Sequence, residues 1–286
     1  TDIQMIVFKP NGIKLEGSAA QDPIVVSQIA TMVKQLPPKV RESLKWIQVN
    51  KRGDTSFFTC GLSEVCANRE GIVITPDVGY GTFFHEASHT RHLQVYDEDA
   101  IKVMEAARTI ADTERNNLGF EGTSVESSSL QSIQQNTFKA RWFNARKESF
   151  QEHGGSASWS LLGYDLRTST WEDGSNDPRG GYMNAYGSSD HTTGGINHGW
   201  FEDIATSTEA SAGSLEVYTQ LVNPQSSFYA EKIGKPIFEN SGIIMDQRMA
   251  QDWATRYRGK LDLLEEYGFI TTRDYCKIVQ NERCKQ

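Results

Sequence analysis

The chain has 286 residues, of which 37% are hydrophobic and 23% charged, and its formal net charge is −8. These proportions are typical of a globular protein and exclude a disordered chain. No apolar run reaches the roughly 18 to 20 residues that cross a bilayer, and the acidic balance without a basic cluster argues against a nucleic-acid binder. We therefore expect neither a nucleic-acid nor a membrane partner.

Short apolar segments and one amphipathic helix alternate in the N-terminal part of the chain. Residues 4–8, 55–60 and 71–76 are rich in β-branched and aromatic side chains and predict strands. Residues 22–36 have helical spacing and end at two prolines, so they predict a helix. Residues 40–49 fit either a helix or a strand.

The rest of the chain reads as mainly helical. The Ser/Gln-rich residues 121–135 fit a loop or a weak helix. The Gly-, Asp- and Asn-rich residues 163–199 predict a long irregular segment, and such segments are usually functional or mobile. Helices are expected over residues 82–95, 97–119 and 137–151, and within residues 200–222 and 244–268.

This order of elements predicts an α+β fold, with a small mixed β-sheet packed on a mainly helical part. No internal repeat and no composition shift marks a linker. We expect a single domain, 1–286, with a sheet-containing part over about 1–95 and a mainly helical part over about 96–286.

The four cysteines fall into two local pairs, Cys60 with Cys66 and Cys276 with Cys284. Four cysteines allow three connectivities, and we favour the local one because each pair brackets a short, turn-like stretch. Two disulfides, in a chain that starts at Thr1 without an initiator Met, predict a mature secreted, extracellular protein. Four reduced thiols in a cytosolic protein are the alternative.

Three histidines and a glutamate stand within eight positions, at His85, Glu86, His89 and His92. Residues i and i+4 lie on one face of a helix, about 6 Å apart along its axis, so His85 and His89 can converge on one Zn²⁺. Glu86 is turned aside, close enough to take a proton from zinc-activated water without binding the metal. The alternative is a chance match in an ordinary amphipathic helix.

Residues near this motif restrict the kind of metal site that it can form. His92 lies seven residues past His85, roughly 10.5 Å along the helix, too far to join the other two histidines around one tetrahedral ion. We expect His92 to support a ligand or to lie at the surface. A metzincin would carry a third histidine where Val95 stands, so that class is excluded. Phe83 and Phe84 predict a helix buried against the preceding strand, where paired histidines need partners.

A catalytic zinc needs three protein ligands and an open position for water, so a further ligand has to come from elsewhere in the chain. Residues 198–210 begin with a Gly-containing turn and then settle into a helix, with two acids in the first turn and a third acid two turns on. The candidates for the third ligand are Glu202, Asp203, Asp190, His191 and Glu209.

The motif at 85–89 together with residues 186–210 resembles the gluzincin metallopeptidases, in particular the anthrax lethal factor-like catalytic domain. In that family a Tyr-Gly, a loop and a glutamate-bearing helix follow HExxH. The resemblance is confined to these two stretches. It implies a zincin-like fold, Glu202 as the third zinc ligand and Tyr186 as the residue that stabilises the oxyanion.

Two features depart from that family. The loop between Tyr186 and Glu202 is longer, and Thr206 stands where the family has an acid four residues after the ligand. We expect Asp203 to take the place of that acid and to orient a histidine by a hydrogen bond. Tyr182 is the alternative to Tyr186 as the residue that stabilises the oxyanion. The GTxxYD-type element of the aspzincins is absent.

These features predict a secreted zinc-dependent endopeptidase that acts on a protein or peptide substrate, and we expect a monomer. Zn²⁺ would activate a water, Glu86 would be the general base, and Tyr186 would hydrogen-bond the oxyanion. His191 and His198 in the Gly-rich stretch are further candidates for assisting the last steps.

Two alternatives come from other classes of protein. One is a zinc hydrolase that uses the same centre on a non-peptide amide or a glycoprotein, with tryptophans lining a sugar-binding cleft: Trp142, Trp159, Trp171 and Trp200. The other is a non-catalytic secreted effector or binding protein with a degenerate site. Substrate digests separate the first alternative from a peptidase, and metal analysis tests the second.

Overall fold

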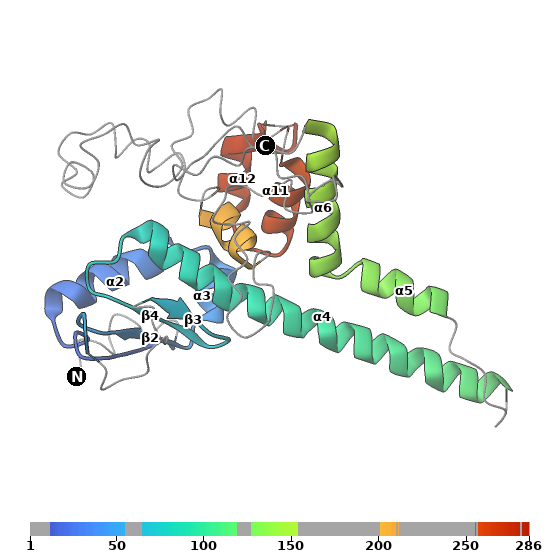
Figure 1. The fold of residues 1–286 in the computed structure, drawn as a ribbon, viewed down its shortest axis with the longest axis horizontal. Helices are drawn as coiled ribbons and strands as arrows, with labels where there is room; N and C mark the ends of the chain where they lie inside the picture. The colour runs from blue at the N-terminus through green and yellow to red at the C-terminus, as the bar shows by residue number, and fades with distance from the viewer. Residues whose placement is uncertain are drawn as a thin grey trace, which may run out of the picture.

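A computed structural model describes residues 12–54, 65–118, 127–153, 201–209, 211, 255, 257–280 and 282–285. Figure 1 shows a small sheet beside the helices α2 and α3, a long helix α4 that starts at the sheet and runs far beyond it, and a group of helices on the other side of α4. The expected α+β class with a small mixed sheet is confirmed.

The sheet has four strands in the order β1-β2-β4-β3. β1 (Lys14–Glu16), β2 (Trp46–Val49) and β4 (Gly71–Ile74) are parallel, and β3 (Cys66–Ala67) is an antiparallel edge strand on β4. All four residues of β4 are buried, as are three of the four in β2. Strands this buried are covered on both faces.

Two helices connect β1 to β2. Asp22 caps α2 (Pro23–Gln35), because its side chain accepts a hydrogen bond from the backbone N–H of Ile24 at 2.9 Å, and Pro23 occupies the first turn. α3 (Pro38–Ser43) follows directly. The ambiguous residues 40–49 therefore hold both alternatives in sequence, the end of a helix and then β2.

α4 (Tyr80–Leu118) is one continuous helix of 39 residues. The stretches 82–95 and 97–119 are both helical, as predicted, but they form one helix and not two, since no Gly or Pro stands at the expected boundary. Phe83 and Phe84 are fully buried in the core that α2 and the sheet form, as expected. The first turns of α4 are therefore fixed to the sheet.

A second core lies among the helices on the other side of α4. α6 (Phe138–His153), α11 (Arg258–Glu266), α12 (Thr272–Val279) and the helical segment 201–209, orange in Figure 1, contribute to it. α4 reaches this core through Val95. Its largest fully buried side chains are Phe138, Trp142, Tyr275 and Phe269.

α5 (Ser127–Gln135) precedes α6 and packs along α4 and α6. The Ser/Gln-rich stretch thus contains a helix, the second of its two predicted alternatives. A cavity of about 550 Å³ lies between α4, α5 and the start of α6, lined by side chains that include Tyr96, Val103 and Phe138.

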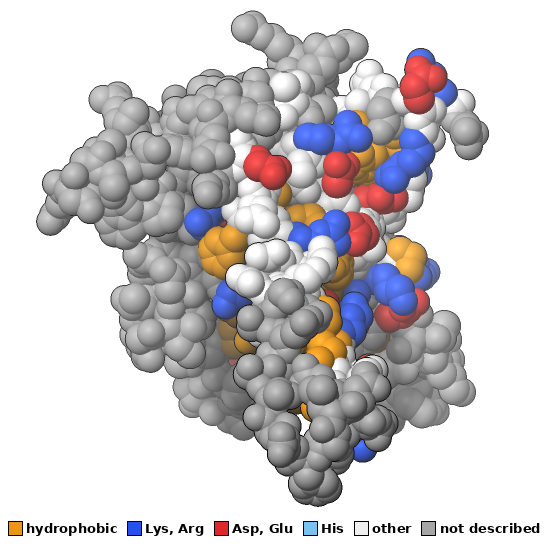
Figure 2. All heavy atoms as spheres, turned by 90° about the vertical axis from the view of Figure 1, so that its right-hand side faces the viewer, with side chains coloured by type: hydrophobic (Ala, Val, Ile, Leu, Met, Phe, Trp, Pro, Cys, Tyr) orange, Lys and Arg blue, Asp and Glu red, His pale blue; other side chains and the backbone are white. Residues whose placement is uncertain are grey.

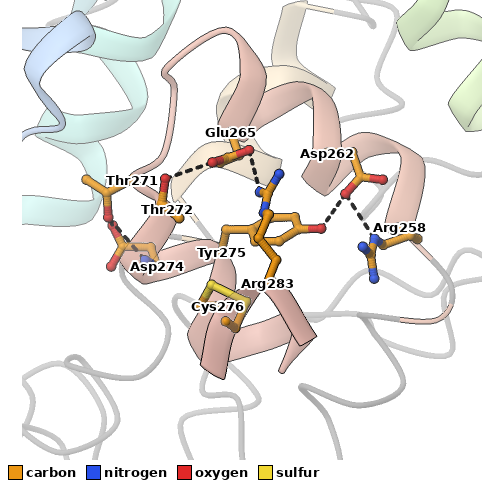
Figure 3. Close-up of a disulfide and its surroundings, with 10 residues drawn as sticks. Arg258, Asp262, Glu265, Thr271, Thr272, Asp274, Tyr275, Cys276 and Arg283 are labelled. Carbon is orange, nitrogen blue, oxygen red and sulfur yellow. Dashed lines mark hydrogen bonds and ion pairs between the residues drawn. A yellow bond between two sulfur atoms is a disulfide. The ribbon is translucent and has the colours of Figure 1, made fainter. Parts of the chain in front are cut away.

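The C-terminal end is closed by a disulfide between Cys276 and Cys284, as predicted. Cys284 lies in the 3-10 helix η3 (Glu282–Lys285), where the neighbouring Arg283 donates a hydrogen bond to Glu265 of α11 at 2.7 Å (Figure 3). The disulfide and this ion pair together hold the last residues against α11 and α12.

Several predictions lie outside the described residues. They are the strands over 4–8 and 55–60 and the irregular segment 163–199. Cys66 is disulfide-bonded, and its expected partner Cys60 is also outside the described part of the chain.

Within the described ranges, no helix combines the length and the apolar character needed to cross a bilayer. Figure 2 shows one face of the molecule, on which Lys and Arg side chains are interspersed with Asp and Glu, and hydrophobic side chains lie between them. Exposed large apolar side chains on α4 are Tyr96, Ile101 and Met104.

Candidate metal centre

His85 and His89 lie one turn apart near the start of α4 and project to the same side of the helix. Their ring centroids are 4.8 Å apart and their planes are nearly perpendicular, at 85°. The side chains are only 9% and 14% exposed. The helical spacing has therefore placed two largely buried imidazoles beside each other.

Glu202 joins them from the helical segment 201–209, more than a hundred residues later in the chain. Its Oε2 lies 3.1 Å from Nε2 of His85, and its Oε1 lies 3.6 Å from Nε2 of His89. The three residues offer ligand atoms that all lie within 4.8 Å of one another. They form a group that could hold a metal ion.

The donor set can be compared with the geometry of a zinc site. Zinc bonds to imidazole nitrogen and carboxylate oxygen are about 2.0 to 2.2 Å long, so ligand atoms in a tetrahedral site are roughly 3.3 to 3.5 Å apart. The two distances from Glu202 to the imidazole nitrogens, 3.1 and 3.6 Å, fall on either side of this value. These distances involve the two different oxygens of Glu202, and the ligand atoms of the three residues lie within 4.8 Å of one another. The residues therefore fit a tetrahedral ion by their chemistry and would draw closer together to bind it.

Glu209 lies behind His85, with its Oε2 3.4 Å from Nδ1 of the imidazole. A carboxylate on the second ring nitrogen fixes the tautomer and the orientation of a ligating histidine. Gly81 makes room for this carboxylate, because a Cβ at that position would lie 2.6 Å from Oε1 of Glu209. Glu209, considered above only as a third ligand, thus supports His85. Its spacing of seven residues from Glu202, two helical turns, was the signal in the sequence.

The role expected of Asp203, to orient a histidine, falls to Glu209 instead. Asp203 is fully buried, and its carboxylate accepts hydrogen bonds from Nε1 of Trp142 at 2.9 Å and from Nζ of Lys260 at 2.8 Å. These contacts direct it toward α6 and α11. Asp203 is thus a buried anchor of the segment 201–209.

The alternative of a sugar-binding cleft requires Trp142 to line an open surface, and the structure places it elsewhere. Its side chain is fully buried in the helical core, where its indole N–H meets Asp203. Trp142 therefore lines no open cleft. Trp159, Trp171 and Trp200 lie outside the described residues.

His92 is fully buried, which excludes the surface position, one of the two alternatives expected for it. Its ring packs 4.4 Å from the ring of Phe201 and 6.0 Å from that of Phe138, measured between centroids. Burial holds the pKa of His92 well below its ordinary value, so the imidazole is neutral at pH 7. It lies in the apolar layer next to the candidate metal ligands.

The carboxylates around His85 change its acid–base behaviour in the metal-free chain. Burial alone would lower the pKa of His85, but hydrogen bonds with Glu202 and Glu209 outweigh it and raise that pKa to about 10. For Glu202, burial opposes ionisation, and the hydrogen bonds with His85 and His89 prevail and lower its pKa. A proton on His85 therefore occupies the position that a metal ion would take.

Glu86, between the two histidines in the sequence, differs from Glu202 in that its pKa is raised. Burial raises the pKa of this carboxyl group, and the electrostatic interaction with His89 and His85 only partly opposes the effect. A carboxylate with a raised pKa is a stronger base, which suits a group that accepts a proton.

The remaining candidates are not part of the described structure. Tyr186 and its rival Tyr182 lie outside the described residues, as do Asp190, His191 and His198. An oxyanion-stabilising role for Tyr186 therefore stays a prediction.

Comparison with known proteins finds no relative of this chain. No family model, no curated protein and no solved structure matches it. The resemblance to the lethal factor-like peptidases rests on residues 85–89 and 186–210 alone. The site is therefore interpreted from the chemistry of its own residues.

Proposed function

We propose that the chain is a secreted zinc-dependent endopeptidase whose metal is held by His85, His89 and Glu202. The observation that carries the proposal is the convergence of two imidazole nitrogens on one carboxylate, at 3.1 and 3.6 Å. Two histidines and one glutamate are one of the ligand sets found in catalytic zinc peptidases, and three protein ligands leave a position for water.

When bound, a zinc ion at this site would acidify a water molecule and polarise the carbonyl group of the substrate. Glu86 accepts the proton from the attacking water and delivers it to the leaving amine. Glu209 keeps a hydrogen on Nδ1 of His85 and so leaves Nε2 for the metal. Tyr186, as implied by the resemblance, donates a hydrogen bond to the carbonyl oxygen as negative charge develops on it.

Two further features support the choice of substrate and compartment. Glu86 follows the first histidine of the HExxH motif, and in metallopeptidases with this motif the glutamate at that position acts as the general base. The disulfide between Cys276 and Cys284 favours an oxidising compartment, and thus secretion.

The proposal is tested by metal analysis together with cleavage of a panel of casein and glycoproteins. Wild type and Glu86→Gln should each bind one zinc per chain, but only wild type should cleave casein, because the amide cannot take the proton. Glu105→Gln is the matched control, since Glu105 is an exposed acid on the same helix. It should cleave like wild type.

Other outcomes distinguish the alternatives. Cleavage by Glu86→Gln would remove this residue from the mechanism. Processing of the glycoproteins without cleavage of casein would point to a glycoconjugate hydrolase that uses the same centre. A chain that binds no zinc would point to a non-catalytic binding protein.

A further inference from the structure

Two adjacent acidic residues at the start of the helical segment 201–209 have different partners. Glu202 faces His85 and His89 on α4, whereas Asp203 is buried against α6 and α11. Consecutive residues of a helix are turned by about 100° about its axis. One rotation of the segment therefore sets the direction of both carboxylates.

Three short hydrogen bonds from two other helices hold Asp203. Nζ of Lys260 donates to its two carboxylate oxygens at 2.9 and 2.8 Å, and Nε1 of Trp142 donates to one of them at 2.9 Å. The side chains of Lys260 and Asp203 are 1% and 0% exposed. The ammonium also lies 5.3 Å from the Trp142 ring and 5.2 Å from the Tyr257 ring, where cation–π attraction adds to its hold.

A buried ion pair is weak evidence for stability, because well-packed apolar side chains of similar volume often stabilise a fold as well or better. The pair between Lys260 and Asp203 instead fixes the orientation of the segment, because a buried charge separated from its partner is strongly unfavourable. The segment 201–209 is thereby restricted to the rotation in which Asp203 meets Lys260. In that same rotation Glu202 faces the imidazoles.

We propose that Lys260 and Trp142 are positioning residues for metal binding: by holding Asp203 they set the rotation of the segment 201–209 and so aim Glu202 at the metal. This inference rests on the proposed function only in that the site binds a divalent ion. It does not require that the substrate be a peptide.

The test is a titration with Co²⁺, whose visible absorption reports the geometry of its ligands. The variant Lys260→Met/Asp203→Asn removes both buried charges together, so that no unpaired charge is left. We expect it to bind Co²⁺ at least about tenfold more weakly than wild type, with an altered absorption spectrum. Its circular dichroism and melting temperature should stay close to those of wild type.

The matched control breaks an ion pair between α6 and α11, the two helices that supply the partners of Asp203. Arg141 of α6 and Glu266 of α11 form two hydrogen bonds of 2.6 Å between partly exposed side chains. Arg141→Met/Glu266→Gln should leave the affinity for Co²⁺ and the spectrum unchanged. A purely structural link between α6 and α11 would affect both double variants alike.

Trp142→Phe provides a second test if the double variant of the buried pair fails to fold. It removes only one donor to Asp203 and keeps an aromatic ring, and we expect a few-fold loss of affinity with a shifted spectrum. A folded variant with the wild-type affinity and spectrum would overturn the positioning role alone. Wild-type protein that binds no Co²⁺ would overturn the metal site and this inference with it.

Discussion

His85 has a carboxylate at each of its ring nitrogens, Glu202 at 3.1 Å from Nε2 and Glu209 at 3.4 Å from Nδ1. A neutral imidazole has one N–H donor and one acceptor nitrogen. Because Glu209 accepts the hydrogen on Nδ1, Nε2 is the nitrogen that is left to bind a metal. Glu209, which is outside the ligand set, thus decides which ring nitrogen of His85 binds the metal.

Glu209 should therefore control metal affinity. Glu209→Gln is expected to weaken zinc binding by about tenfold, because the amide lacks the charge that orients His85 and makes it more basic. Competition with a chelator measures the change, and Glu105→Gln is again the control. Gly81→Ala should act in the same direction, since its Cβ would displace the Glu209 carboxylate. Unchanged affinity in both variants would show that Glu209 has no supporting role.

Metal affinity should also depend on pH. In the metal-free chain the pKa of His85 is raised to about 10, so at pH 7 its proton has to leave before Nε2 can bind. Zinc affinity is then expected to rise by about tenfold per pH unit near neutrality. Calorimetry in two buffers of different ionisation enthalpy measures the protons released. A titration that releases none would contradict a protonated His85.

At the scale of the element, α4 connects the site to both cores. Its first turns are buried in the sheet core through Phe83 and Phe84, and it reaches the helical core three turns later through Val95. The two histidines lie between these contacts. Their position is thus fixed by burial on both sides of the site.

Loss of the first of these contacts should be costly. Phe84→Ala is expected to lower the free energy of unfolding by about 3 to 5 kcal/mol, because it removes a fully buried aromatic side chain and leaves a cavity. Tyr96→Ala on the same helix is the control, since Tyr96 is 43% exposed. Urea unfolding compares the two variants. Equal, small losses would mean that the start of α4 is not anchored in this way.

The elements that sequence reasoning predicted well are those set by local spacing. α2 has a capping Asp22 and two terminating prolines, and the i, i+4 spacing of His85 and His89 places both on one face in any helix. The continuity of α4 was missed because the acidic residues 97–99 look like a helix start. The short strands β1 and β3 were missed because two or three residues carry no periodicity.

The site could be predicted less fully than these elements, because it depends on contacts between distant segments of the chain. Glu202 could be singled out only through a family resemblance, because its distance from the histidines depends on how the segment 201–209 packs. The partners of Asp203 could not be predicted at all, since Lys260 and Trp142 are more than fifty residues away in the sequence. Contacts between distant segments leave no pattern in a single chain.

At the scale of the whole molecule, the candidate metal centre lies where the two cores meet. His85 and His89 belong to a helix that is anchored on the sheet, while Glu202 belongs to a segment whose Ile204 is buried in the helical core. A bound ion would therefore join the two cores, in addition to its role in chemistry.

Zinc should accordingly stabilise the entire chain. A ligand that binds only the folded state at a concentration 1,000 times its dissociation constant adds about 4 kcal/mol to the free energy of unfolding. We expect a higher melting temperature in zinc than in a chelator, measured by calorimetry. In His89→Ala the two melting curves should coincide, and a persistent difference there would place the stabilising ion at another site.

The most direct test of the account is X-ray absorption at the zinc edge of the loaded protein, in wild type and in Glu202→Ala. The wild-type spectrum should show one zinc per chain with two imidazoles and oxygen ligands at about 2.0 to 2.2 Å, and no sulfur. Glu202→Ala should bind zinc far more weakly. A wild-type chain without zinc, or a Glu202→Ala site with the wild-type spectrum and affinity, would contradict the assignment of His85, His89 and Glu202 as the metal ligands.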